Sequence, residues 1–134
     1  MNEKKSSEQN DWKNKAIVGL TENVTINGSS SKKNVVARMD TGATKSSFDI
    51  GLAAELKLGP VIDSRLIKSA HGTKLRPVVE VEVFISSRTI KARFTVADRS
   101  HMRYPVLIGQ NILKQDFLID PNRRADAPIK AKNE

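Results

Sequence analysis

Apolar and polar residues alternate regularly along two neighbouring stretches of the chain, residues 79–85 and 90–96. A period of two residues is typical of a β-strand with one buried face, because successive side chains of a strand point to opposite sides. Ser-Ser-Arg separates the two stretches, which together predict an antiparallel hairpin. The predicted inner face consists of Val79, Val81, Val83, Ile85, Ile90, Ala92, Phe94 and Val96.

A second hairpin is predicted nearer the N-terminus. Val24 and Ile26 alternate with polar residues, and Asn27-Gly28 is a common turn sequence. Residues 35–39 then resume an extended apolar run that leads to Asp40.

The period changes to that of a helix after this hairpin. Leu52, Ala53 and Leu56 form an apolar stripe, Asp49 can cap the helix, and Gly59-Pro60 ends it. A shorter helical turn is expected after Gly109, and residues 116–120 are expected to form a closing strand. The pattern as a whole predicts a mainly β fold: a small, closed, antiparallel β-barrel with one or two short helices.

The ends of the chain differ from its middle. Residues 1–15 and 122–134 are polar and unpatterned, so we expect two flexible tails around one domain at residues 16–121. We find no internal repeat, and no apolar stretch approaches the roughly 20 residues needed to cross a bilayer. The basic N-terminus lacks the apolar segment of a secretory signal, so we expect a cytoplasmic protein without a membrane partner.

Composition narrows the chemistry. Lys and Arg number 23 against 15 Asp and Glu, a net charge of +8, but aromatic residues are only 4%, too few for a base-stacking surface. We therefore favour a solvated basic surface that attracts acidic substrates, with nucleic-acid binding as a weaker alternative. The absence of cysteine excludes disulfides, thiolate nucleophiles and cysteine-based zinc sites.

The candidate catalytic group is Asp40, which ends an apolar strand and is followed by Thr41 and Gly42. Asp before Gly is ordinarily a turn former. A carboxylate that activates water for amide hydrolysis needs a second carboxyl beside it, so that one member of the pair is basic and the other acidic. Since the chain has one copy of the motif and no duplicated half, the second Asp40 would come from another subunit across a two-fold axis.

Three stretches in order carry a resemblance to a known family: ARMDTGATKSS, RPVVEVEVFI and DRSHMRYPVLIGQNILKQDFLIDPNR. The chain resembles retropepsin-like aspartic peptidases. Among them it looks like the small prokaryotic family often labelled "ATP-dependent zinc protease", found in association with RimK-type peptide ligases. The resemblance spans residues 16–123 and implies a homodimeric aspartic endopeptidase that acts on a peptide or protein and needs no cofactor.

The resemblance also implies roles for individual residues. Asp40 is the catalytic acid, Thr41 the interlocking hydroxyl and Gly42 the turn residue. The small Ala43 lets the loops pack closely, and Ile108-Gly109 belongs to the element that packs beneath the catalytic loop. A hairpin that folds over the substrate as a flap is assigned to Ala70, His71, Gly72 and Thr73, with Gly72 at its tip.

Two features depart from that pattern. Many members of the wider group have Arg after the glycine of the hydrophobic-Gly element, where this chain has Gln110. The zinc label also lacks a ligand set, because His71 and His101 are the only histidines and no His-Glu-x-x-His motif is present. We predict no metal.

Other residues have simpler interpretations. We expect His71 on the surface of a hairpin and His101 in a polar loop, and Asp120-Pro121 most simply ends a strand. Arg99 and Arg103, with Asp98, either organise the loop before Gly109, which we favour, or bind an acidic peptide. Trp12 packs on the domain or contacts a partner. The alternative to an enzyme is a catalytically silent dimer that binds a peptide or a partner protein such as a RimK-type ligase.

Overall fold

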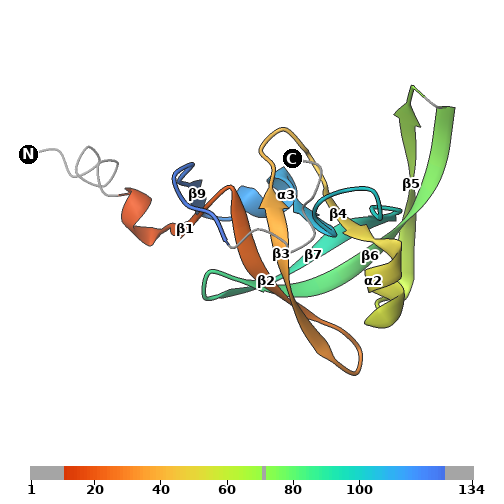
Figure 1. Cartoon of the computed structure of the whole chain (residues 1–134), viewed down its shortest axis with the longest axis horizontal. Coiled ribbons are helices and arrows are strands. Elements are labelled where there is room, and N and C mark those ends of the chain that lie inside the picture. Colours follow the sequence, from red (N-terminus) through yellow and green to blue (C-terminus); the bar gives the residue numbers. More distant parts are fainter. Residues whose placement is uncertain (1–10, 71, 126–134) are drawn as a thin grey trace, which may run out of the picture.

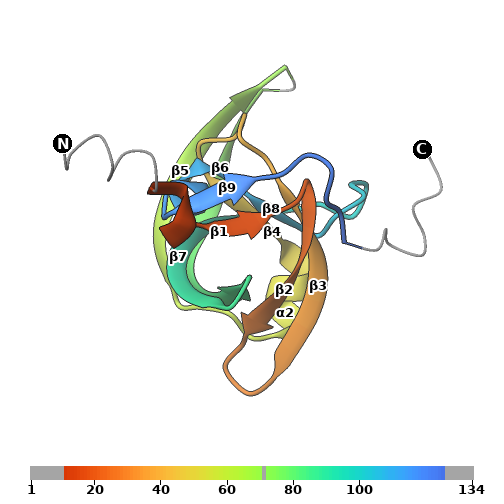
Figure 2. The same ribbon diagram turned by 90° about the vertical axis from the view of Figure 1, so that its left-hand side faces the viewer.

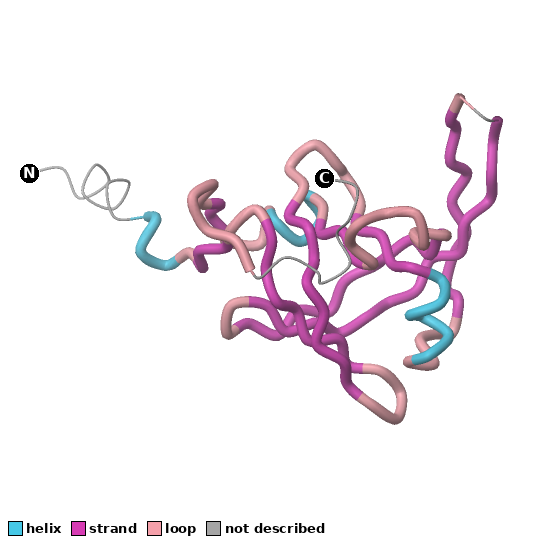
Figure 3. The backbone as a smooth tube through the Cα atoms, viewed as in Figure 1, coloured by secondary structure: helices cyan, strands magenta, loops and turns pink. Residues whose placement is uncertain are grey.

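The computed structural model describes residues 11–70 and 72–125. Strands form most of this part of the chain (Figure 3). In chain order the elements are η1 (Asp11–Asn14), β1 (Ala16–Val18), β2 (Thr21–Asn27), β3 (Lys32–Met39), β4 (Ser46–Asp49), α2 (Ile50–Glu55), β5 (Val61–Ser69), β6 (Gly72–Ile85), β7 (Arg88–Ala97), β8 (Val106–Ile108), α3 (Gln110–Leu113) and β9 (Phe117–Ile119).

Six strands close into a barrel. Their order is β2-β3-β8-β4-β7-β6, and a further pairing of β2 with β6 completes the ring, while β5 adds to the outside of β6. The fold class predicted from the sequence is confirmed. The structure adds that β3–β8 and β4–β7 run parallel, whereas the other neighbouring strands of the barrel are antiparallel.

The interior of the barrel is formed by the alternating positions. Every residue of the predicted inner face of β6 and β7 is buried, whereas Phe84, on the opposite face, is 44% exposed. Phe48 of β4 meets Phe94 of β7 edge to face, with ring centroids 5.6 Å apart. Both rings are fully buried, so this pair joins the two parallel strands through the core.

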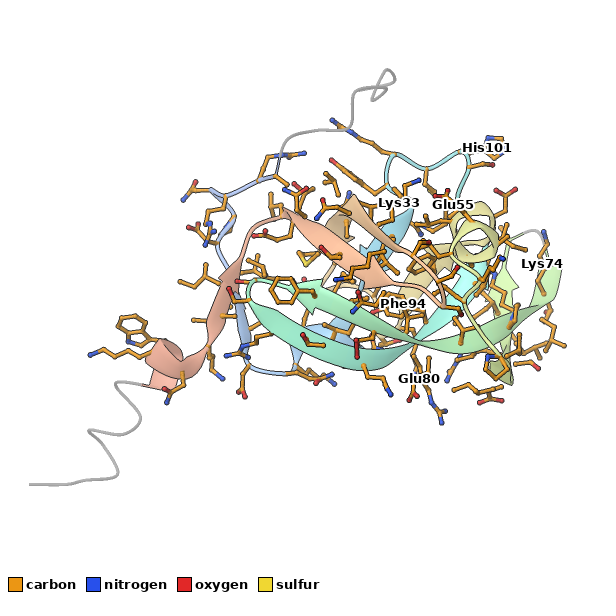
Figure 4. The ribbon with its side chains drawn as sticks, turned by 90° about the horizontal axis from the view of Figure 1, so that it is seen from below. Lys33, Glu55, Lys74, Glu80, Phe94 and His101 are labelled. Carbon is orange, nitrogen blue, oxygen red and sulfur yellow. The ribbon has the colours of Figure 1, made fainter. Side chains whose placement is uncertain are left out.

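Helix α2 has the predicted cap. The Asp49 side chain accepts hydrogen bonds from the amides of Gly51 and Leu52, which satisfies donors that the first turn leaves free. Leu52 is buried against the core, and Glu55 forms an ion pair with Lys33 of β3 at 2.9 Å (Figure 4). The helix is thereby fixed against the wall of the barrel.

Strands β1 and β9 form a separate parallel ribbon, which lies across one end of the barrel (Figure 2). The Arg88 guanidinium, at the start of β7, donates to the carbonyls of Asn14, Gln115 and Asp116 and stacks on the ring of Phe117. One side chain thus ties segments from both ends of the described chain to the barrel.

The hairpin of β5 and β6 extends beyond the barrel. It projects on the same side as the loop between β3 and β4 (Figure 1). Leu66 and Leu75 are cross-strand partners on this hairpin and are 61% and 67% exposed. The helices in the described part of the chain are all too short to span a membrane.

Candidate active site

Asp40 follows β3 directly and begins a tight turn. Its amide donates to the carbonyl of Ile108 at 2.8 Å, which continues the parallel pairing of β3 with β8. The amide of Gly42 donates to Asp40 Oδ1 at 2.9 Å. A Cβ atom at residue 42 would lie 3.2 Å from the same oxygen, so glycine leaves room for the carboxylate. The backbone therefore orients the half-buried Asp40 side chain.

Helix α3 holds the loop that carries Asp40. The amide of Gln110 donates to the Ala43 carbonyl at 2.8 Å, and its side-chain Nε2 donates to the Thr41 carbonyl at 2.7 Å. The amide of Asn111 donates to the Thr44 carbonyl at 3.2 Å. Gln110, noted from the sequence as a departure from the wider group, therefore fixes the turn next to Asp40.

Gly109 allows this close approach. A Cβ atom at this position would collide with the carbonyl oxygen of Lys45 and would lie 2.9 Å from that of Ala43. Its φ of −103° is open to any residue, so the requirement for glycine comes from space. Ile108 and Gly109 are both buried, and Gly109 lies against the backbone of the loop.

Ser46 connects the loop to its support. Its hydroxyl accepts from the Gly109 amide at 2.9 Å and donates to Asn111 Oδ1 at 2.7 Å. Asn111 Nδ2 in turn donates to the Arg93 carbonyl, and the Thr95 hydroxyl donates to the Ser46 carbonyl. Because Ser46 is fully buried, these bonds are protected from water. The sequence did not predict that Ser46 links the loop to α3, because a serine within a polar run gives no local signal of such a role.

Asp40 lines a pocket of about 440 Å³ and is the only carboxylate among the described residues that form it. Four arginines line the same pocket: Arg38, Arg99, Arg103 and Arg124. Leu20, Met102 and Leu107 supply apolar surface. The site therefore combines one acid with a cationic wall that favours anionic groups of a ligand.

The loop before β8 is organised by its charged residues. Arg99 Nε donates to the Tyr104 carbonyl at 3.1 Å, and the Arg99 amide donates to Asp49 Oδ1 at 2.8 Å. Burial lowers the pKa of the Arg99 guanidinium, against the opposing effect of Asp49. Hydrogen bonds from Ser100 lower the pKa of Asp98. Arg99 thus shapes the loop, the role favoured from the sequence, and also lines the pocket.

The predicted flap residues lie apart from the pocket. Ala70, Gly72 and Thr73 are exposed at the end of the projecting hairpin and do not line the Asp40 pocket, while His71 lies outside the described residues. His101 is exposed on the outer loop (Figure 4). No cluster of three or more His, Cys, Asp or Glu suited to a metal ion occurs in residues 11–70 and 72–125, so these donors do not fit a zinc site.

Residues 52–129 match the model of the family described as RimB-like, retropepsin-like aspartic endopeptidase RimB. The chain belongs to the RimB-like family. The match covers more than half of the sequence and includes the arginine-rich loop, Gly109 and α3. It begins after Asp40 and so does not include the Asp40 turn.

Solved structures share the fold of this RimB-like chain. A Legionella pneumophila protein of unknown function has a TM-score of 0.59 and 18% identity, over 81% of this chain and 95% of that one. EIAV protease, solved with the inhibitor HBY-793, has a TM-score of 0.57 and 26% identity, over 70% and 84%. Simian foamy virus protease has a TM-score of 0.53 and 20% identity, over 70% and 91%. A comparison with curated proteins gives no match.

Ser46→Ala tests the buried connection. We expect the free energy of unfolding to fall by about 1–3 kcal/mol, because the substitution leaves the Gly109 amide and the Asn111 side-chain oxygen without their shared partner. Urea unfolding followed by circular dichroism measures the change. Ser47→Ala is the matched control, since Ser47 is adjacent and makes no side-chain hydrogen bond within the described residues. Equal losses in the two variants would contradict the role assigned to Ser46.

Proposed function

We propose that the protein is an aspartic endopeptidase that works as a homodimer. The observation that carries the proposal is the position of Asp40: a carboxylate oriented by the Gly42 amide, in a pocket without a second acid among the described lining residues. Membership of the RimB-like family supports the reaction class. A two-fold axis next to the Asp40 loop would supply the second carboxyl.

In the proposed mechanism, the two Asp40 carboxyls hold a water molecule between them. Two like charges this close cannot both ionise, so the pair shares one proton. The ionised carboxylate takes a proton from water as the oxygen attacks the scissile carbonyl, and the other carboxyl protonates or hydrogen-bonds the carbonyl oxygen. Collapse of the tetrahedral intermediate breaks the C–N bond and releases the amine after proton transfer. No covalent enzyme intermediate is needed.

Thr41 supports the dimeric arrangement. Its side chain is exposed, and its hydroxyl makes no hydrogen bond to the rest of the described chain, although its carbonyl is held by Gln110. The sequence resemblance implies that this hydroxyl interlocks with the partner subunit. An exposed hydroxyl without a hydrogen bond in its own described chain is available for that contact. Leu20 and Met102, which line the Asp40 pocket, are 39% and 60% exposed and provide apolar surface for contact with a second subunit.

The projecting hairpin is proposed as the flap. Gly72 has a φ of 109°, a conformation that favours glycine, and nothing lies within 4 Å of the place where its Cβ would be. The open surroundings and the exposed paired strands suit a segment that moves toward an extended peptide. The described hairpin residues at 70–73 stand away from the pocket, so closure over Asp40 would require movement or the second subunit.

A second candidate is a dimer that binds a peptide or a partner protein, such as a RimK-type ligase, without cleaving it. The arginine-lined pocket is suited to such binding as well as to catalysis. Peptide cleavage separates the two candidates, because only an enzyme produces new peptide termini.

Asp40→Asn is expected to lower kcat/KM for peptide cleavage by at least about a thousandfold, because the amide cannot act as the general base. Mass spectrometry of a diverse peptide pool, incubated at mildly acidic to neutral pH, measures the loss. Asp116→Asn removes an exposed carboxylate that does not line the Asp40 pocket and should retain activity. Intact peptides with the unmodified protein, together with unchanged binding by Asp40→Asn, would favour the silent dimer.

Mixing the two forms tests whether the acids come from different subunits. When equal amounts of active protein and Asp40→Asn exchange freely, activity per total chain should fall to about one quarter, because only one pair in four retains both carboxyls. Sedimentation equilibrium establishes the dimer under the same conditions. Retention of one half of the activity would indicate that each chain acts alone.

The arginines beside Asp40 predict a preference for acidic side chains near the scissile bond. Arg38→Gln with Arg124→Gln should raise KM for a glutamate-containing peptide about three- to tenfold, since two attractive charges are lost. The KM for the glutamine-matched peptide should change little. Lys32→Gln with Lys114→Gln removes the same charge from exposed positions that do not line the pocket. Equal effects on both peptides would contradict a role of these arginines in charge selection.

A further inference from the structure

A second pocket, of about 270 Å³, shares no residue with the pocket around Asp40. It is formed by Lys45 at the end of the Asp40 loop, Arg65 of β5, Val78 of β6 and residues 91–95 of β7. Asn111 of α3 and Gln115, which follows that helix, complete it. No function is assigned to this pocket by the proposed peptidase mechanism, and its properties stand independently of that mechanism.

The second pocket is cationic. Lys45, Arg65, Lys91 and Arg93 all line it, and no acidic residue is among its described lining residues. Like charges gathered around one volume repel one another unless an anion lies between them. The arrangement therefore resembles a recognition site for a group with more than one negative charge.

The protein itself neutralises little of this charge. Within residues 11–70 and 72–125, Lys45, Arg65 and Lys91 form no hydrogen bond or ion pair through their side chains, and Arg93 has only a 3.9 Å contact with Asp63. Both partners of that contact are more than half exposed, which makes it weak.

Two glutamates offset part of the charge of Lys91, because Glu80 and Glu82 line a separate, adjoining pocket with it. Glu80 is the cross-strand neighbour of Arg93, and Glu82 that of Lys91. Neither lines the second pocket, and Glu82 accepts a hydrogen bond from Asn27 instead. Figure 4 shows Glu80 on the outside of the barrel.

The base of the pocket is firmly held. Val78, Phe94 and Thr95 are buried there, and Thr95 is fixed by its bond to the Ser46 carbonyl. Asn111 is fixed between Ser46 and the Arg93 carbonyl. The charged side chains therefore surround a constant base, so that ligand binding need not reorganise the backbone.

We propose that this second pocket binds a phosphate group, either as the free ion or as a phosphate monoester. Guanidinium groups bind phosphate oxygens through paired hydrogen bonds, and ammonium groups add point charges. A dianion compensates more of the four charges than a single carboxylate can. Nucleic acid is disfavoured, because Phe94, the aromatic residue of the described lining, is fully buried and offers no face for base stacking.

The bound group would join two separate segments. Lys45 ends the loop that begins at Asp40, and Arg65 belongs to the projecting hairpin. Phosphate held by both side chains would restrain the hairpin relative to that loop. Binding itself does not require Asp40, so Asp40→Asn should take up phosphate with unchanged affinity.

Calorimetric titration of the full chain with inorganic phosphate, and separately with phosphoserine, tests the proposal at an ionic strength held constant with sodium chloride. We expect saturable binding of at least one of the two probes, with stoichiometry of one per chain. Tighter binding of phosphoserine would assign the site to esters, and tighter binding of inorganic phosphate would assign it to the free ion. Absence of saturable binding of both probes would overturn the proposal.

Substitutions locate the binding. Lys45→Gln with Arg65→Gln should weaken the affinity for phosphate at least about tenfold. The control, Lys68→Gln with Lys74→Gln, removes two charges from the hairpin outside the pocket. It should change that affinity by less than about twofold. Circular dichroism verifies folding, and Lys91→Gln alone provides a second variant, expected to weaken binding about threefold or more. Equal weakening by the control pair would indicate a diffuse charge effect and reject the site.

Discussion

The close approach of Gly109 to the loop at residues 40–45 is the constraint on which the candidate active site depends. The absence of a side chain brings α3 under the loop, where backbone amides from the helix reach the carbonyls of Ala43 and Thr44. The buried Ser46 hydroxyl then binds both the Gly109 amide and Asn111. Asp40 is positioned at the end of this series of contacts, by the Ile108 carbonyl and the Gly42 amide.

Both pockets border this supported loop. On one side, Asp40 lies beside four arginines; on the other, Lys45 lies among three further cations. Eight of the 23 Lys and Arg residues thus line these two pockets. A rigid backbone keeps these like charges at defined positions, which a flexible basic tail could not do.

The sequence predicted the elements whose patterns are local. Alternation identified the strands β6 and β7, and Asp49 with its apolar stripe identified α2. It did not identify β4, whose four residues form a strand because β7 and β8 flank them. The part of β5 that precedes the predicted flap was also not predicted. Its side chains are mostly exposed, so apolar and polar residues do not alternate along it.

The same distinction applies to the site. Asp-Thr-Gly is contiguous and could be recognised, but the arginines around it come from β3, the loop before β8 and the segment after β9, so their meeting depends on the closed barrel. The sequence singled out Gln110 only because many members of the wider group have Arg at this position. Its bond to the Thr41 carbonyl depends on a contact between residues far apart in sequence.

That separation has a consequence for biosynthesis. The amide of Asp40 needs the carbonyl of Ile108, and the turn that follows needs Gln110 and Asn111. A growing polypeptide therefore cannot assemble this turn while residues 108–111 are still inside the ribosomal exit tunnel. Asp40 leaves the tunnel before these residues do, so its native geometry forms only after residues 108–111 have also emerged.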